Sequence, residues 1–152
     1  MNNPLILTAL DAPDLDPEDD PDAYVGKYII PYYVLPEVKT QAQNIICFET
    51  SMTEQPRNNS IQKYQQIIFY ILADPKNIYD RETGIARHDL IAALIQDEFD
   101  WSNDFGFQVH LVSDRPYAVD SNKYVLRTLI FEQVTPNGYS NLGNIVNKVR
   151  FD

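Results

Sequence analysis

Residues 61–73 read IQKYQQIIFYILA and residues 87–99 read RHDLIAALIQDEF, and these two stretches decide the fold. In the first, apolar residues occupy both alternating faces from Ile67 onwards. This pattern predicts a strand buried on two sides, by a helix on one face and by a partner or an arm on the other. In the second, apolar residues recur at intervals of three and four, which predicts an amphipathic helix.

Three further strands are predicted around this pair. Residues 44–51 form a short apolar run, and residues 107–113 and 124–135 have the composition and alternation of strands. We expect the sequence Asp-Arg-Pro at 114–116 to end the strand at 107–113, because proline lacks a backbone donor. The resulting order predicts an α+β fold: a mainly antiparallel sheet of four or more strands with one helix packed on a face.

The N-terminal segment has a different composition. Residues 1–26 contain seven acidic residues, several prolines and neither Lys nor Arg, so we expect an extended arm over residues 1–27. Residues 28–35 are rich in β-formers but include Pro31, which predicts an edge strand that can pair with another chain. We therefore divide the chain into an acidic arm (1–27), a core domain (28–136) and a C-terminal arm or short strand (137–152).

Composition restricts the function. The formal net charge of −10 argues against binding free nucleic acid, which requires a basic surface. The charge is concentrated in the N-terminal segment, because the rest of the chain has 15 acidic and 12 basic residues. Ten tyrosines in 152 residues favour extensive protein contacts, since the Tyr ring is apolar and its hydroxyl is polar.

The single cysteine and the N-terminus indicate the compartment. Cys47 lies in an apolar strand and has no second cysteine to pair with, so we expect a buried, inert thiol. The N-terminal residues lack a charged region followed by an apolar one, and no run of apolar residues is long enough to span a membrane. A soluble protein made in a cytosol is the expectation.

Few residues suggest catalysis or metal binding. Asp14, Asp16 and Glu18 have alternate spacing, but a calcium loop starting at Asp14 lacks its glycine and its final glutamate. His88 and His110 are the only histidines, and we expect them to be a polar helix residue and a sheet contact. Residues Asp114, Arg115, Asp120 and Arg127 are expected to form structural ion pairs. We predict no catalytic residue, no cofactor and no metal, and hence a protein that is not an enzyme.

With this order of elements, residues 44–136 resemble the tail-terminator, or tail-completion, proteins of long-tailed bacteriophages. The resemblance is carried by the strand IICFE (45–49), the strand QIIFYILADP (66–75), a single helix over 85–99 that contains RHDL, and the closing strands at 107–113 and 124–131. Members of that family commonly begin with a helix before the first strand. In this chain the first 43 residues are Pro-rich and lack a helical period.

The resemblance implies a structural virion protein. Such proteins form a ring, typically of six copies, that caps the tail tube and joins it to the head connector, with DNA passing through without specific binding. The implied partners are further copies, the tail-tube protein and the head–tail connector protein. The implied location is the virion neck, and the host cytoplasm during assembly. The candidate subunit-interface residues are Tyr28, Ile30, Tyr32, Tyr33, Tyr70, Arg87 and Arg127.

Three alternatives remain open at this point. The chain could be another neck component, such as a head-closure or adaptor protein. It could be an acidic inhibitor that mimics DNA with residues 11–22, in which case its binding would depend strongly on salt. It could be a small intracellular enzyme that uses His88, Asp89 or Asp114.

Overall fold

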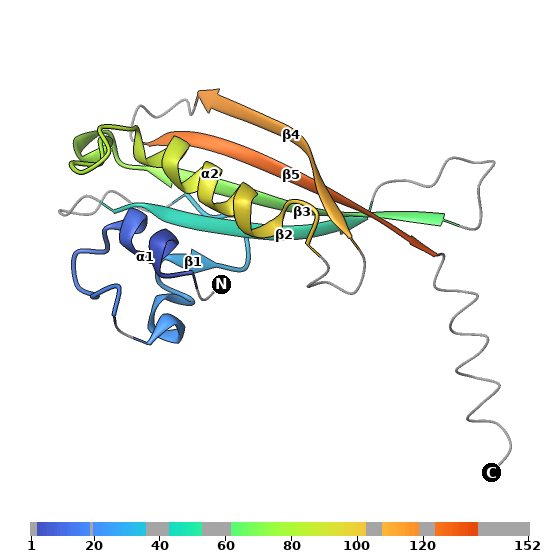
Figure 1. Cartoon of the computed structure of the whole chain (residues 1–152), viewed down its shortest axis with the longest axis horizontal. Helices are drawn as coiled ribbons and strands as arrows, with labels where there is room; N and C mark the ends of the chain where they lie inside the picture. The colour runs from blue at the N-terminus through green and yellow to red at the C-terminus, as the bar shows by residue number, and fades with distance from the viewer. Residues whose placement is uncertain are drawn as a thin grey trace, which may run out of the picture.

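The computed structural model describes residues 3–18, 20–35, 43–52, 62–102, 108–118 and 124–136. It is an α+β fold with a five-stranded, mostly antiparallel sheet and a helix packed on one face, as the sequence predicts, and it has a second helix that was not predicted (Figure 1). The elements in chain order are the helix α1 (Pro4–Leu10), the strands β1 (Ile29–Ile30), β2 (Ile45–Met52) and β3 (Gln62–Ala73), the helix α2 (Arg87–Phe99), and the strands β4 (Val109–Ala118) and β5 (Val125–Pro136).

The sheet has the strand order β1-β2-β3-β5-β4. Strand β1 runs parallel to β2, and every other pair is antiparallel. The two longest strands, β3 and β5, are therefore central, and β1 and β4 are the edges. The edge position of β1, directly before Pro31, agrees with the predicted edge strand, but only Ile29 and Ile30 of residues 28–35 form it. Pairing of this edge with another chain stays a prediction.

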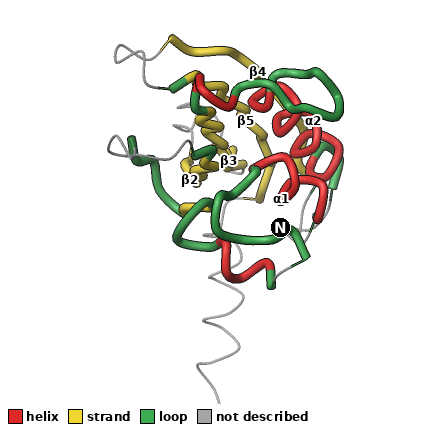
Figure 2. Tube along the Cα trace, turned by 90° about the vertical axis from the view of Figure 1, so that its left-hand side faces the viewer, coloured by secondary structure: helices red, strands yellow, loops and turns green. Residues whose placement is uncertain are grey.

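Both helices lie on one side of the sheet, where the main core is formed (Figure 2). The buried stripe of α2 consists of Ile91, Ala92 and Ile95, as the spacing of three and four predicts. It packs against a cluster of aromatic rings, in which the centroid of Phe69 lies 5.8 Å from that of Phe131 in an edge-on arrangement. None of the described helices is long and apolar enough to cross a membrane.

The N-terminal segment differs from the prediction. Residues 4–10 form a helix whose Ile6, Leu7 and Leu10 are buried in the main core, so the expectation of an extended arm is wrong there. The Asn3 side chain accepts a hydrogen bond of 3.0 Å from the Leu5 N–H, and Pro4 occupies the first helical position. These are standard signals for a helix start. Seven residues are too few to show a helical period, and a helix this short requires tertiary packing.

Strand β4 also differs from the prediction. It continues through Asp114, Arg115 and Pro116 to Ala118, although we expected these residues to end it. An edge strand tolerates proline, because one side of its backbone has no strand partner. The register shifts between Leu111 and Ser113, which makes Val112 the extra residue of a β-bulge. The predicted polar loop at 53–60 and the predicted strand or arm at 142–151 lie outside the described residues.

The described residues cover only part of the second face of the sheet. A smaller apolar cluster lies there, formed by Ile30, Ile45, Cys47, Leu72, Tyr124 and Leu126. Cys47 is fully buried in it, as predicted. Next to this cluster the sheet surface is open, and the open part is the candidate functional site.

Candidate interaction surface

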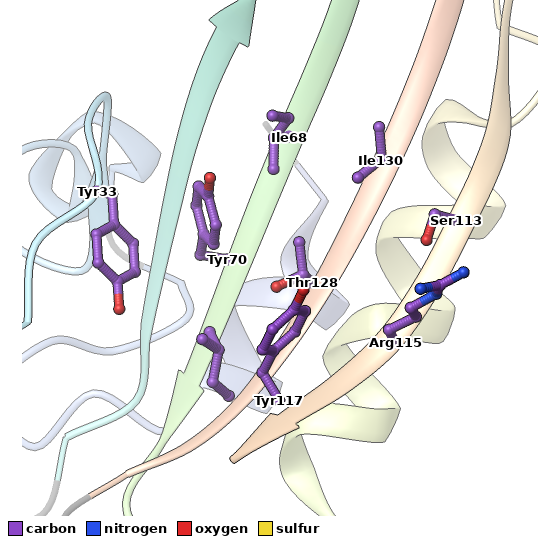
Figure 3. A pocket seen from close by; sticks show the side chains of 9 residues that line it. Tyr33, Ile68, Tyr70, Ser113, Arg115, Tyr117, Thr128 and Ile130 are labelled. Atoms are coloured by element: carbon purple, nitrogen blue, oxygen red, sulfur yellow. The ribbon is translucent and has the colours of Figure 1, made fainter. Parts of the chain in front are cut away.

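An open groove of about 310 Å³ lies on the sheet face opposite the helices (Figure 3). Three neighbouring strands and the segment after β1 form it. The lining residues, which we call the sheet groove, are Tyr33, Ile68, Tyr70, Ser113, Arg115, Tyr117, Leu126, Thr128 and Ile130.

Strand pairing explains why these residues meet. Side chains two apart on a strand point to the same face, and the register aligns them across strands. Ile68 pairs with Ile130, and Thr128 lies between its partners Tyr70 and Arg115. The aligned side chains of the three strands therefore form a continuous surface. It is apolar at Ile68 and Ile130 and has hydroxyl groups around these two residues.

The Val112 bulge determines which residues β4 contributes. Before the bulge, Val109 and Leu111 contact the main core under the helices. Because the bulge adds one residue, Ser113, Arg115 and Tyr117 point to the opposite face instead of continuing that row. The sequence prediction ended this strand at Ser113 and assigned Arg115 to structural ion pairs, so it did not identify these residues as candidate site residues. Simple alternation beyond Ser113 would have placed them in the core.

Tyr33 and Tyr70 form one wall of the groove. Their ring centroids are 4.7 Å apart and the rings are tilted by 57°. The Glu49 carboxylate accepts a hydrogen bond of 3.1 Å from the Tyr33 backbone N–H and one of 3.4 Å from the Tyr70 hydroxyl. Burial and the nearby Glu49 charge raise the pKa of the Tyr70 hydroxyl, so it stays a neutral donor. This wall is held in place by hydrogen bonds as well as by ring contact.

The other wall is more exposed. Tyr117 has 59% of its surface exposed, and Arg115 is also exposed. Among the described residues, no carboxylate lies within ion-pair distance of Arg115. A partner that enters the groove therefore meets aromatic and aliphatic surface, several hydroxyl groups and one positive charge.

The helix side of the same strands contains an ion-pair cluster. Arg127 on β5 binds the Asp114 carboxylate with two hydrogen bonds of 2.7 Å and also pairs with Asp89 on α2. Asp114 raises the pKa of the Arg127 guanidinium, while burial lowers the pKa of His88, whose Nε2 lies 3.2 Å from Asp89. The pairing of Asp114 with Arg127 agrees with the expectation of structural ion pairs. Arg115 lies on the other face, and Asp120 is outside the described residues.

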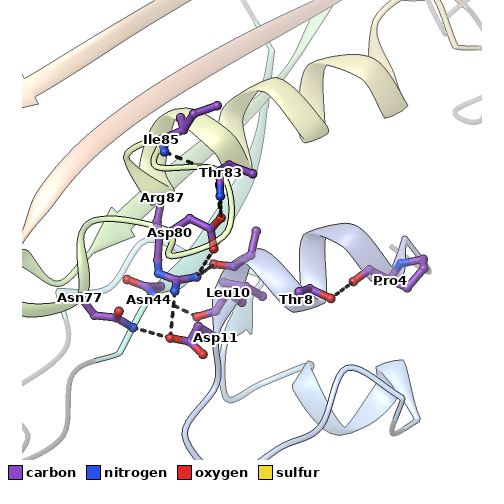
Figure 4. A network of polar contacts seen from close by, with 11 residues as sticks. Pro4, Thr8, Leu10, Asp11, Asn44, Asn77, Asp80, Thr83, Ile85 and Arg87 are labelled. Atoms are coloured by element: carbon purple, nitrogen blue, oxygen red, sulfur yellow. Dashed lines mark hydrogen bonds and ion pairs between the residues drawn. The ribbon is translucent and has the colours of Figure 1, made fainter.

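A second polar network joins α1 to the rest of the domain (Figure 4). The Arg87 Nη1 atom donates a hydrogen bond of 3.1 Å to the Ala9 carbonyl, and the Asn44 side chain donates one of 2.9 Å to the Leu10 carbonyl. These carbonyls belong to the last turn of α1, which has no intrahelical partner for them. Arg87 also pairs with Asp11 at 3.2 Å and with Asp80 at 3.5 Å.

The predicted interface residues fall into two groups. Tyr33 and Tyr70 line the sheet groove and Tyr32 is exposed beside it. Arg127 is engaged in its ion pairs, while three others are buried within the subunit: Tyr28, Ile30 and Arg87. The Tyr28 hydroxyl donates to Asp14, and burial together with this carboxylate raises the Tyr28 pKa. The buried residues stabilise the subunit, so the prediction of an interface now depends mainly on Tyr32, Tyr33 and Tyr70.

The two histidines lie near opposite ends of α2. His88 is in the first turn, and His110 stacks on Trp101 beyond the last turn at a centroid distance of 5.6 Å. Helix length alone separates these positions by about 18 Å, since each residue adds about 1.5 Å. Within the described part of the chain, no group of three or more His, Cys, Asp or Glu residues could hold a metal ion.

Comparison with known proteins identifies one family. The YomW family model matches residues 3–133, which include every described helix and strand up to most of β5. No curated protein matches the chain.

Proposed function

The chain belongs to the YomW family, which is of phage origin, and from this premise we propose that it is a tail terminator of a long-tailed bacteriophage. In this role several copies form a ring that caps the tail tube and presents a docking surface to the head connector. The chain then acts in the virion neck and in the host cytoplasm during assembly. It transforms no substrate.

The observation that carries the proposal is the open sheet face. A groove of about 310 Å³ is lined by three tyrosines and three aliphatic residues, on a sheet whose other face is covered by two helices. Interface cores are enriched in aromatic residues, and Tyr and Arg are common at contacts that dominate binding. A ring also requires two different surfaces on each copy, because heterologous contacts generate closed rings. The groove supplies one of them.

The N-terminal helix supports the same proposal. Tail-terminator proteins commonly begin with a helix before their first strand, and the sequence alone gave no such element here. The helix α1 now occupies this position, buried against α2 and the sheet. The observed order of helix, strands, helix and strands is therefore closer to the order in tail-terminator proteins than the order that we predicted from the sequence. The similarity is one of architecture, and it supports the assignment without defining the partners.

Charge is compatible with a ring around DNA. The net charge of −10 would repel the phosphate backbone, so DNA could pass through a ring of such subunits without adhering. The acids at 14, 16, 18, 20 and 22 are exposed on the segment between α1 and β1.

Negative-stain microscopy with tail tubes tests this proposal. The purified chain, mixed with tail tubes of the phage that encodes it, should form a ring on one end of each tube. Tyr117→Ser should abolish or weaken ring formation, because Tyr117 is 59% exposed in the groove. Tyr79→Ser is the matched control, since Tyr79 is 68% exposed and is not part of the groove.

The outcomes separate the alternatives. Rings on the head connector but not on tail tubes would indicate another neck position, such as an adaptor. Failure of the wild-type chain to bind either structure would reject the proposal. Binding to a basic nuclease or other DNA-binding protein, abolished by raising the salt concentration, would favour an inhibitor that mimics DNA.

A further inference from the structure

We infer that the free edge of β4 and the adjoining sheet groove receive residues 142–151 of a neighbouring copy, which add to the sheet as a further strand. The inference rests on the proposed function, because it specifies how copies join in the ring. It commits to one occupant, the C-terminal segment of a second copy.

The first argument is the unpaired edge. Within the described part of the chain, β4 pairs as a strand only with β5. Before the bulge its outer edge is occupied, because Val109 bonds to Trp101 and Ser102 and the Leu111 N–H donates to Asp100. The edge that can pair with another strand is therefore the part from Val112 to Ala118. Addition of an extended segment to such an edge is a common mode of protein recognition. Pro116 lacks a backbone donor and the bulge lies at Val112. Both features limit the length of regular pairing, which suits a short added segment better than a full-length strand.

The second argument is the pattern of the segment itself. Residues 145–151 read IVNKVRF. One alternating face is mainly apolar and consists of Ile145, Asn147, Val149 and Phe151, and the other carries the two basic residues and consists of Val146, Lys148 and Arg150. If a strand with this pattern pairs with β4, its apolar face lies on one side of the sheet and its basic face lies on the other.

Charge complementarity sets the orientation of the added strand. On the helix side of β4, Asp114 and Asp89 share the single guanidinium of Arg127, which leaves an excess negative charge that is partly exposed. The lining residues of the groove include Arg115 and no carboxylate, and the two carboxylates nearby on that face, Glu49 and Glu132, accept hydrogen bonds from Tyr70 and Gln66. The basic face of the segment therefore fits the helix side, and the apolar face fits the groove side beside Tyr117.

The third argument is where the described chain ends. Strand β5 lines the groove as far as Ile130 and continues to Pro136, about 20 Å further along at about 3.3 Å per residue. Both sides of β5 are already occupied, by β3 and β4. Figure 1 shows β5 extending beyond the body of the domain at this end. The 16 residues beyond Pro136 can reach about 50 Å when extended, which is enough to reach a neighbouring subunit.

Disulfide trapping tests the contact directly. Two single variants of the full chain, Val112→Cys and Val149→Cys, are mixed, assembled and oxidised. We expect a disulfide between copies, identified by peptide mapping, because Val112 lies on β4 and is exposed. The native Cys47 is buried and should not take part. Mixing Tyr79→Cys with Val149→Cys is the control and should give no such product, because Tyr79 is exposed but belongs neither to the groove lining nor to β4.

A charge reversal gives an independent test. The double variant Lys148→Glu and Arg150→Glu should assemble at least tenfold less tightly than wild type in sedimentation experiments. The control is Lys76→Glu with Arg81→Glu, two exposed basic residues whose reversal changes the net charge equally. Equal loss in both variants would mean that only overall charge matters, and would overturn the inference.

The results also separate this inference from the proposed function. Rings on tail tubes without the disulfide, and with normal assembly of the Lys148 and Arg150 variant, would reject the strand addition and leave the tail-terminator role standing. A double variant with both cysteines in one chain, closing its own disulfide at high dilution, would mean that the segment binds its own sheet. No assembly of wild-type protein under any condition would reject both proposals.

Discussion

Arg87, the first residue of α2, donates a hydrogen bond of 3.1 Å to the carbonyl oxygen of Ala9 in the last turn of α1. The two residues are 78 positions apart in the sequence. A positive charge at a helix C-terminus is favourable because it faces the negative end of the helix dipole. The contact therefore joins the N-terminal helix to the second half of the chain.

Replacing Arg87 should destabilise the protein strongly. Arg87→Met removes the bond to Ala9 and the pairs with Asp80 and Asp11, and leaves a carbonyl without its donor. We expect the free energy of unfolding to fall by about 2–4 kcal/mol in urea titrations, as for other broken buried pairs. The control is Arg81→Met at an exposed position, which should change it by less than about 0.5 kcal/mol. A similar, small effect for both would show that the network is not stabilising.

The burial of α1 can be tested with the same substitution at two positions. Leu10→Ala removes a fully buried side chain from the main core, and we expect a loss of about 2–5 kcal/mol in the free energy of unfolding. Leu5→Ala, on the same helix but 60% exposed, should cost about 1 kcal/mol or less. Thermal or urea unfolding measures both. If both substitutions changed the free energy of unfolding by the same small amount, residues 4–10 would not be part of the folded core.

Stability should depend on His88 at mildly acidic pH. Burial lowers the pKa of His88 in the folded state, despite the opposing effect of Asp89. Below about pH 6.5, the usual His value, the unfolded chain binds a proton that the folded chain resists. The free energy of unfolding should therefore fall as the pH decreases from 7 towards the lowered pKa of the folded state.

The variant His88→Gln should lose this part of the pH dependence. Urea titrations at several pH values between 5 and 7 measure it, with His110→Gln as the control at the position stacked on Trp101. An unchanged pH profile in His88→Gln would contradict the prediction.

The Cys47 thiol should be unreactive in the folded protein. It is fully buried, and burial raises its pKa, so little thiolate is available for reaction. We expect Ellman's reagent to label it at least a hundredfold more slowly in buffer than in concentrated urea. Rapid labelling of folded protein would show that the smaller apolar cluster opens frequently.

Much of the fold was predictable from local pattern. The bounds of α2 agree with the prediction, and β2, β3 and β5 begin and end within one residue of it. These elements are long, periodic or strongly apolar, and each lies in or on the sheet that forms the core. The edge position of β1 was also predictable, because Pro31 restricts pairing.

The remaining features depend on contacts that no local pattern encodes. The helix α1 has only seven residues, and its stability depends on α2 and on Arg87 far along the chain. The continuation of β4 depends on pairing with β5, which overrides the Asp-Arg-Pro signal. Tyr117 and Arg115 could be assigned to the groove only after the bulge was located. The resemblance implied that Tyr28 lies at a subunit interface, but its side chain is buried and its hydroxyl donates to Asp14 within the subunit.

The bulge at Val112 divides β4 into two parts. The part before it packs into the main core, and the part after it presents side chains in the sheet groove, where a neighbouring molecule would bind. If the bulge were lost without shortening β4, Val112 would enter the ladder and each later residue would shift by one position, which would move Arg115 and Tyr117 under the helices and Asp114 to the groove face. The central strands would be unaltered by this slip. A change of register at this edge would therefore give related chains new binding preferences while the central strands keep their packing.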